Sequence, residues 1–276
     1  MNDAILRVIP LGGLGAIGKN MTVIEYDDSM LVVDCGLMFP DEDMLGVDLV
    51  LPDFSYVLEN RDKALGVLIT HGHEDHVGAL PYLLKQADMP VFGSRLTLGL
   101  INGKLGEHGL QGHVDLHEVG PAKPVELGPF TVEFLEVCHS IPDAIGIVIH
   151  TPIGSVVHAT DYKFDQHPVD GKLTDVQTGI NSVADRDRTD AISISEFFGD
   201  RAQNITCTWV SLILKEDHRV RIRRIMITHS SGEGRNRPSA WIARHQRQGI
   251  LVLLGAPGVR ADKQGRYPGL PQGDRR

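Results

Sequence analysis

The chain has 276 residues, of which 42% are hydrophobic, so it is long enough to bury the core of one large α/β domain or of two small ones. It has no N-terminal basic stretch followed by an apolar run and a cleavage site, and no window approaches the roughly 20 apolar residues that span a bilayer. The cysteines Cys35, Cys138 and Cys207 lack Cys-x-x-Cys spacing, which suits free thiols in a reducing compartment. We therefore expect a soluble cytoplasmic protein.

The formal net charge of −9 conceals two unlike parts of the chain. Residues 1–175 contain 10 Lys and Arg against 26 Asp and Glu, a net charge of −16, whereas residues 176–276 contain 17 against 10, a net charge of +7. The basic residues also change in type, because 7 of the 10 in the first part are Lys and 15 of the 17 in the second are Arg. A basic part is typical of a surface that faces nucleic acid, but it can equally reflect an unrelated or misread segment.

The N-terminal third begins with short apolar runs that are rich in β-branched residues. Residues 5–11, 21–26 and 30–34 are separated by glycine-rich or Asp-Asp-Ser turn signals, and they predict three strands of a β-meander. Residues 64–70 predict a further buried strand, and residues 77–87 carry apolar side chains at helical spacing.

Two later segments predict a second set of strands. Residues 125–137 form one apolar run, and residues 144–159 form another that folds into a hairpin at Thr151-Pro152-Ile153-Gly154. The order and spacing of all these elements predict an α/β fold with two sheets and helices outside them.

The signals weaken over the rest of the chain. Residues 208–214 fit a strand or a helix, residues 220–228 fit a strand, and the Gly/Pro/Arg-rich tail from residue 255 predicts disorder. We therefore divide the chain into an N-terminal domain, residues 1–175, and an unassigned segment, residues 176–276, for which we expect no stable core of its own.

A glycine motif near the N-terminus matches the pattern G-x-G-x-x-G. It runs from Gly13 to Gly18 and follows a predicted strand, so a dinucleotide site is one interpretation. That fingerprint requires a helix whose N-terminus holds the pyrophosphate, yet residues 21–26 predict another strand. We expect no nucleotide cofactor and instead a loop that brings backbone close to the active site.

The chemistry of the chain is concentrated in one segment, His71-Gly72-His73-Glu74-Asp75-His76, at a predicted strand-to-helix junction. In extended backbone His71, His73 and Asp75 point to the same side, while His76 enters the first helical turn beside them. Imidazole nitrogens and a carboxylate suit zinc or another borderline divalent ion, and two pairs of ligands provide for two neighbouring metals. A solvated polar loop is the alternative, but four metal-competent side chains within six residues argue against it.

Further ligands are expected where later strands end. His139 follows the run that ends at residue 137, and Asp161 follows the run that ends at residue 159, so both can face the first loop, and Asp161 could bridge two metals. Asp34, at the end of the third strand, could orient a ligand or serve only a turn. His158 lies within a strand and should contact neighbouring chain, and Cys138 should be a buried, inert thiol.

Six stretches of the first 175 residues together resemble a known family. They are residues 11–20, 33–40, 46–60, 70–84, 139–144 and 161–165. They resemble the N-terminal part of ribonuclease J, in the β-CASP branch of the metallo-β-lactamase superfamily. The His-x-His-x-Asp-His segment alone implies only the superfamily, whereas Gly36-Leu37-Met38-Phe39-Pro40 and Pro52-Asp53-Phe54-Ser55-Tyr56 narrow the resemblance to ribonuclease J.

The resemblance implies a metallo-β-lactamase-like αββα sandwich over residues 1–175, incomplete and followed by a poorly defined C-terminal segment. It also implies two zinc ions: His71, His73 and His139 hold the first, Asp75 and His76 hold the second, and Asp161 bridges them. Asp75, His76 and Asp161 are then the catalytic set.

Two features depart from the family pattern. The family usually has Thr-Gly before the bridging aspartate, whereas this chain has Ala159-Thr160. From about Val176 we recognise neither a β-CASP domain nor the later histidine that completes the second metal site. A truncated or frame-disrupted reading of a longer gene explains this change better than a divergent second domain does. His229, after a predicted strand, is a candidate replacement ligand.

The predicted function is zinc-dependent hydrolysis of RNA phosphodiesters, in which paired divalent ions activate water and stabilise charge on the phosphate. RNA is implied by the resemblance and not by the metal motif, since the same kind of site opens lactams, thioesters and lactones. A small-molecule hydrolase of the same fold and an inactive metal-binding fragment are the alternatives. Exonuclease or endonuclease action and the formation of a homo-oligomer stay open.

Overall fold

Short β-branched runs separated by tight turns build the first sheet of the computed structural model. Strands β1 to β6 lie side by side in sequence order, with β1, β2 and β3 antiparallel and β3 to β6 parallel. The strands are β1 (Leu6–Gly12), β2 (Met21–Tyr26), β3 (Ser29–Val33), β4 (Ala64–Leu68), β5 (Val91–Gly93) and β6 (Leu116–Glu118). The structure describes residues 5–13, 17–121, 123–163, 165, 167–175, 207–216 and 219–228.

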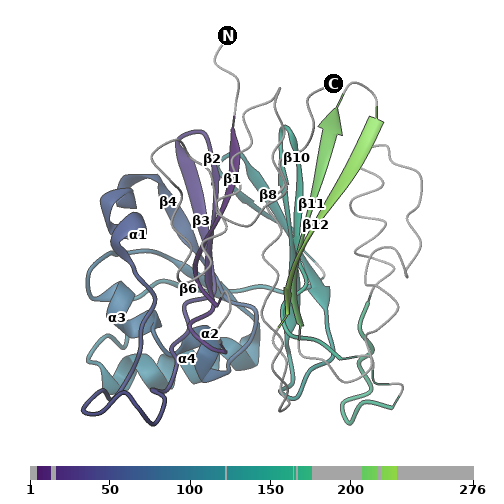
Figure 1. Cartoon of the computed structure of the whole chain (residues 1–276). Helices are drawn as coiled ribbons and strands as arrows, with labels where there is room; N and C mark the ends of the chain where they lie inside the picture. The colour runs from purple at the N-terminus through teal and green to yellow at the C-terminus, as the bar shows by residue number, and fades with distance from the viewer. Residues whose placement is uncertain are drawn as a thin grey trace.

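Helices cover the outer face of this sheet, because a parallel pair of strands needs a crossover connection and the helix provides it (Figure 1). Their bounds are α1 (Ser55–Glu59), η1 (Arg61–Lys63), α2 (Glu74–Val77), α3 (Leu80–Leu84) and α4 (Arg95–Glu107). None of the helices in the described ranges combines the length and the apolarity that a membrane span requires.

The second sheet is an antiparallel meander that faces the inner side of the first sheet (Figure 1). Its strands are β7 (Val125–Leu127), β8 (Phe130–Glu136), β9 (Ile145–Thr151), β10 (Gly154–His158), β11 (Cys207–Glu216) and β12 (Arg219–Thr228), again in sequence order. Strand β11 pairs with β10 over five residues, so the meander continues past the proposed domain boundary at residue 175.

Strand β3 shows how the layers are held together. Leu31 and Val33 pack into the core between the two sheets, whereas Met30 and Val32 pack into the core under the helices. A strand that is buried on both faces needs an unbroken apolar run, as residues 30–33 provide. Phe130 of β8 is fully buried between the sheets.

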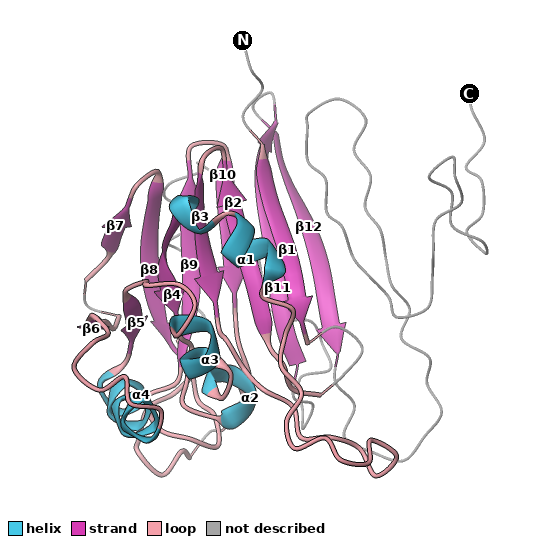
Figure 2. Ribbon diagram, turned by 90° about the vertical axis from the view of Figure 1, so that its left-hand side faces the viewer, coloured by secondary structure: helices cyan, strands magenta, loops and turns pink. Residues whose placement is uncertain are grey.

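Most predicted elements are confirmed, and so is the α/β sandwich. The three-strand meander, the strand before the histidine motif and the hairpin at residues 151–154 are present. The run at residues 125–137 divides into β7 and β8, and residues 208–214 and 220–228 lie in strands β11 and β12. Among the described residues helices cover only the first sheet, so these residues supply three of the four αββα layers (Figure 1). In Figure 2, which is turned by 90°, helices α1, α2 and α3 lie in front of the strands. The predicted disordered tail from residue 255 lies outside the described ranges.

Helix α4 was missed because its stability comes from packing and not from helical propensity. It contains Gly99 and Gly103, where an added Cβ atom would meet nothing within 4 Å. The side chains that it buries are Thr97, Ile101 and Leu105. Three buried positions in a glycine-rich segment give a weaker helical periodicity in the sequence than a typical amphipathic helix does. Strands β5 and β6, of three residues each, are too short to show a period.

A buried carboxylate ties helix α1 to the first sheet. Glu25, on β2, is 1% exposed, and its Oε1 atom lies 2.8 Å from Arg7 Nη1 and 3.5 Å from Lys63 Nζ. The hydroxyl of Tyr56, on α1, donates a hydrogen bond to Glu25 Oε2. Because an unpaired buried charge is strongly destabilising, these three partners make Glu25 compatible with the core.

We expect Tyr56→Phe to lower the free energy of unfolding by about 1 kcal/mol near neutral pH. Burial and the neighbouring Glu25 carboxylate raise the pKa of Tyr56 to about 12. Folding therefore favours the neutral phenol, and this contribution is complete below the unfolded pKa of about 10 and is lost as the pH rises through about 12. Denaturant unfolding of both proteins at several pH values tests this.

The stability difference between wild type and Tyr56→Phe should shrink over that alkaline window. Tyr82→Phe, on α3, is the matched control, because the Tyr82 ring packs against His108 and not against a buried carboxylate. A difference for Tyr56→Phe that stays constant through the window would contradict the assigned role of Glu25.

Candidate metal centre

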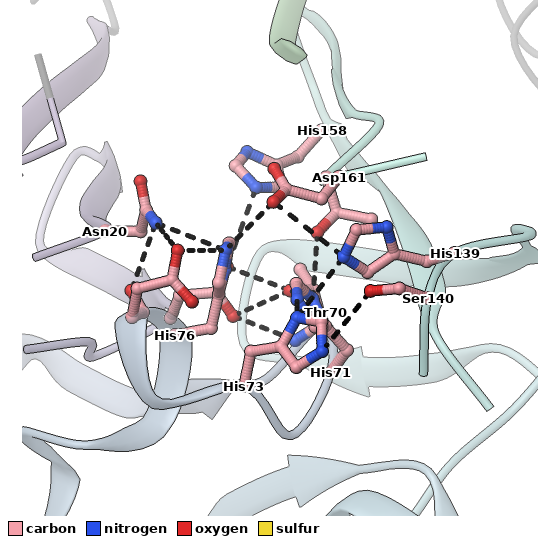
Figure 3. Close-up of polar contacts among 12 residues, drawn as sticks. Asn20, Thr70, His71, His73, His76, His139, Ser140, His158 and Asp161 are labelled. Atoms are coloured by element: carbon pink, nitrogen blue, oxygen red, sulfur yellow. Dashed lines mark hydrogen bonds and ion pairs between the residues drawn. The ribbon is translucent and has the colours of Figure 1, made fainter. Parts of the chain in front are cut away.

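Polar side chains from both sheets meet at one end of the sandwich (Figure 3). His71 and His73 lie in the loop that follows β4, and His76 lies in the short helix α2. His139 follows β8, and Asp161 follows β10. The ends of these three strands lie in the same region, so His71 and Asp161, which are 90 positions apart in the chain, become neighbours.

Three histidines form the first group. His71 Nε2 lies 3.0 Å from His73 Nδ1, and His139 Nε2 lies 3.3 Å from the same His73 atom. One ligand atom from each of these residues lies within 4.8 Å of the others, which allows them to bind one cation together. His71 is fully buried, whereas His73 and His139 are partly exposed.

A second group combines imidazoles with carboxylates. Ligand atoms of His71, His76 and Asp161 also lie within 4.8 Å of one another. His76 Nε2 lies 3.6 Å from Asp161 Oδ2 and 3.6 Å from Asp75 Oδ2, and Asp161 Oδ2 is 3.9 Å from His139 Nε2. Asp161 therefore stands between the two groups and reaches both.

The carboxylate of Asp34 orients a histidine of each group. Asp34 is 1% exposed; it accepts hydrogen bonds from the Thr70 backbone N–H (2.9 Å) and hydroxyl (2.9 Å), and its Oδ2 lies 2.8 Å from His76 Nδ1. The Thr70 hydroxyl also lies 3.0 Å from His71 Nδ1. With Nδ1 of each ring engaged as a donor, the Nε2 lone pairs face the cluster, as metal ligation requires. Of the two roles considered for Asp34, the geometry supports orientation of a ligand.

Burial and charge set the protonation states of the cluster. Burial, reinforced by the neighbouring histidines, holds the pKa of His71 well below its usual range, and burial lowers the pKa of His139 to about 4 despite the Asp161 carboxylate. Burial also acts to lower the pKa of His76, but the carboxylates of Asp34 and Asp161 outweigh it and raise that pKa to about 10. A positive charge is therefore favoured beside His76, and a divalent cation would replace the proton there.

Asn20, two residues after the glycine motif, also contacts the site, although its sequence context did not single it out. Asn20 Nδ2 donates to the backbone carbonyl of Asp75 at 3.0 Å and to its Oδ2 at 3.3 Å, and it lies 3.1 Å from His76 Nε2. Gly36 also packs against this turn, where an added Cβ atom would lie 1.6 Å from the Asp75 carbonyl oxygen. The backbone N–H of Asn20, just after the glycine motif, also donates to the Asp75 carbonyl at 3.0 Å, which agrees with a loop whose backbone lies near the candidate site, and a strand follows it as predicted. The absence of a nucleotide cofactor stays a prediction.

Thr160, next to Asp161, has the left-handed backbone conformation, with φ of 57°. It is fully buried, and its hydroxyl lies 3.4 Å from His71 Nδ1. This is the position at which the family resemblance leads one to expect glycine. A β-branched residue in this conformation costs on the order of 1–2 kcal/mol of backbone strain, so threonine lowers the stability of the fold relative to glycine at this position.

Two other predictions concern neighbours of the site. His158, predicted to contact neighbouring chain, has its Nε2 atom 3.9 Å from Asp34 Oδ2, without a hydrogen-bond partner in the described part of the chain. Cys138 and Cys35 are buried free thiols, and burial raises the pKa of each, which agrees with the expected inert role. His229 lies outside the described residues.

The two stacked sheets, with helices on the outer face of the first and a histidine and aspartate cluster at the strand ends, define an α/β sandwich protein with a candidate metal centre. The chain belongs to the metallo-beta-lactamase superfamily, since the model of that family matches residues 14–196. Among curated proteins it is 49% identical over 174 residues to "Ribonuclease J" of Synechocystis and 48% identical over 176 residues to "Ribonuclease J" of Thermus thermophilus. These matches cover 62% and 61% of this chain but only 27% and 31% of the relatives, so the chain spans less than a third of their length.

We expect His73→Ala and His76→Ala to reduce the content of bound divalent metal, because each removes a nitrogen from one of the two groups. His117→Ala is the matched control: His117 pairs with Asp115 at 2.9 Å on β6, outside the cluster. Elemental analysis of the purified proteins measures the metal content. Wild-type content in both variants would remove the cluster as the binding site.

We expect Asp34→Asn to weaken metal binding about 10–100-fold without removing any candidate ligand, because His76 and Thr70 lose the charged acceptor that orients them. Competition with a chromophoric chelator measures the affinity. Asp53→Asn provides the control, since the Asp53 side chain is exposed and accepts a hydrogen bond from the Ser55 backbone N–H in a turn outside the cluster. Equal affinities for wild type and Asp34→Asn would show that the orientation does not matter.

Proposed function

We propose that this chain carries the metal-binding part of a zinc-dependent ribonuclease of the ribonuclease J type. The observation that carries the proposal is the convergence of two ligand groups on Asp161, in a chain that is 47–49% identical to three proteins named ribonuclease J. This similarity favours RNA over the small-molecule substrates of the alternative interpretation. RNA as partner and a cytoplasmic location are part of the proposal.

The donor set fits zinc. The first group offers imidazoles from His71, His73 and His139, and the second offers His76 and Asp75, with Asp161 shared. Imidazole nitrogen and carboxylate oxygen are preferred zinc ligands, and burial keeps His71 and His139 in the neutral form that binds metal. Because the proposal assigns His71 to the first ion, Asp75, His76 and Asp161 are the described residues left for the second ion, one fewer than for the first, so the proposal assigns the second ion the weaker affinity.

Two divalent ions held there would supply Lewis-acid activation of water and charge stabilisation at a phosphodiester. The chain contributes the geometry. His71 and His76 are fully buried and form the floor, whereas His73, Asp75 and the exposed Ser140 lie toward solvent. An RNA strand therefore approaches from the side of His73 and Ser140, and the hydrogen bonds of Asp34, Thr70 and Asn20 hold the floor in place as it binds.

The division of the chain is a separate part of the proposal. Residues 1–175 form the metallo-β-lactamase-like unit, and residues 176–276 are a divergent or frame-disrupted segment, of which β11 and β12 extend the second sheet. The coding DNA provides the test. A β-CASP sequence in another frame downstream supports a disrupted frame, and its absence supports a divergent segment.

We expect the zinc-loaded chain to cleave 5′-monophosphorylated single-stranded RNA far more slowly than a full-length relative assayed in parallel, with approximately one tightly bound zinc ion per chain. The reason is that the second ligand group would bind its metal ion weakly, and a single ion would contact the phosphate from one side only. His73→Ala should abolish the turnover, while a thioester and a lactam should not be hydrolysed. Faster hydrolysis of either small molecule than of RNA would overturn the proposed substrate.

A further inference from the structure

The two sheets hold their contributions to the site in different ways. The candidate ligands after β4 are fixed by Asp34, Thr70 and Asn20. His139 and Asp161 instead lie in irregular loops after β8 and β10. The hydrogen-bond, ion-pair and ring contacts that the described residues make with the His139 ring come from other candidate ligands, namely His71, His73 and Asp161. No described polar group outside the candidate ligands holds this ring, so the backbone that carries His139 is the first place to look for what positions it.

Residues 170–175, hereafter the crossing segment, run over both of these loops. The Thr174 hydroxyl accepts a hydrogen bond from the Cys138 backbone N–H at 2.9 Å and donates one to the Lys163 carbonyl at 3.1 Å. A direct bond from the Lys163 N–H to the Cys138 carbonyl, 2.7 Å long, completes the connection. Cys138 precedes His139 directly, and Lys163 follows Asp161 by two residues. One hydroxyl thus links the backbones that carry both ligands.

Lys172 of the crossing segment spans the His139 loop from end to end. Its Nζ atom lies 2.8 Å from Glu136 Oε1, where β8 ends, and 3.1 Å from Asp143 Oδ1, just before β9 begins. The Asp175 backbone N–H also donates to the Glu136 carbonyl at 2.8 Å. Because the Lys172 side chain is 45% exposed, its ion pairs contribute less than the part-buried hydrogen bond from the Cys138 N–H to the Thr174 hydroxyl.

We propose that Thr174 is a positioning residue of the metal centre, and that Lys172 supports it: the crossing segment sets the separation of His139 and Asp161 through their backbones. The inference rests on the proposed metal site. It predicts that metal affinity depends on a hydroxyl that touches neither ligand side chain nor metal. It also assigns residues 170–175 to the metal centre and not to a connecting loop.

The test uses the full 276-residue chain with the substitutions Thr174→Val, Thr174→Ser and Lys172→Met. Valine keeps the shape of threonine without its hydroxyl, and serine keeps the hydroxyl. Thr131→Val is the matched control, because the Thr131 hydroxyl donates to Glu126 at 2.7 Å on the hairpin of β7 and β8, at the other end of β8 from Glu136. Zinc affinity is measured by chelator competition, the ligand geometry by the visible absorption of the Co²⁺-loaded protein, and backbone protection by amide hydrogen exchange.

We expect Thr174→Val to weaken zinc binding about 10–100-fold, to change the cobalt spectrum and to speed exchange of the Cys138 amide hydrogen. Thr174→Ser should restore all three, Lys172→Met should have a smaller effect, and Thr131→Val should have none. A purely structural role would lower the unfolding temperature of the metal-free Thr174→Val protein and leave the affinity and the spectrum unchanged, which would overturn the inference.

The proposed function and this inference fail in different ways. Wild-type protein that binds neither Zn²⁺ nor Co²⁺ would overturn the proposed metal site and this inference with it. Wild-type protein that binds metal, together with a Thr174→Val protein of equal affinity and identical cobalt spectrum, would overturn the inference alone.

Discussion

The carboxylate of Asp34 is the constraint on which the candidate metal centre depends. It is buried, and an ionised group buried without partners would cost several kcal/mol. Its partners are the Thr70 backbone and hydroxyl and the His76 ring, and through Thr70 it reaches His71. The same bonds that make the charge tolerable therefore set the orientation of one histidine in each ligand group. A substitution that breaks the hydrogen bonds of Asp34 should therefore change both the stability of the fold and the orientation of these histidines.

The rest of the fold brings the other ligands to that fixed centre. The first sheet and its helices provide the floor, with His71 and His76 fully buried, while the loops of the second sheet bring His139 and Asp161 across from the opposite side. A site assembled from two sheets has its ligand distances set by the packing between them, here by fully buried side chains such as Leu31 and Phe130. Because protein interiors are close-packed and hardly compressible, a change in this packing would shift the two sheets and alter the distances between the ligands.

Much of this arrangement could be predicted from the sequence, and the limits have a physical cause. Apolar runs predict the strands of the first meander. The histidine motif predicts a metal site because it places several metal-ligand side chains at the end of a strand. Asn20 and Thr174 could not be found in this way. Each acts through a few hydrogen bonds to backbone that is 55 and 36 residues away, and a single polar residue in a loop leaves no periodic signal. Helix α4 was missed for a related reason, since packing on the sheet and not local propensity stabilises it.

The left-handed conformation of Thr160 has a consequence for how the chain tolerates change. The strain at that residue lowers the free energy of unfolding, so less stability remains to offset destabilising mutations elsewhere. Natural proteins lie only a few kcal/mol above the threshold for folding, so about 1–2 kcal/mol corresponds roughly to one average destabilising substitution. A population of sequences carrying threonine here should therefore accumulate fewer neutral changes in the sandwich core than one carrying glycine. The conformation of one residue beside the metal centre would then limit the rate at which distant parts of the domain can diverge.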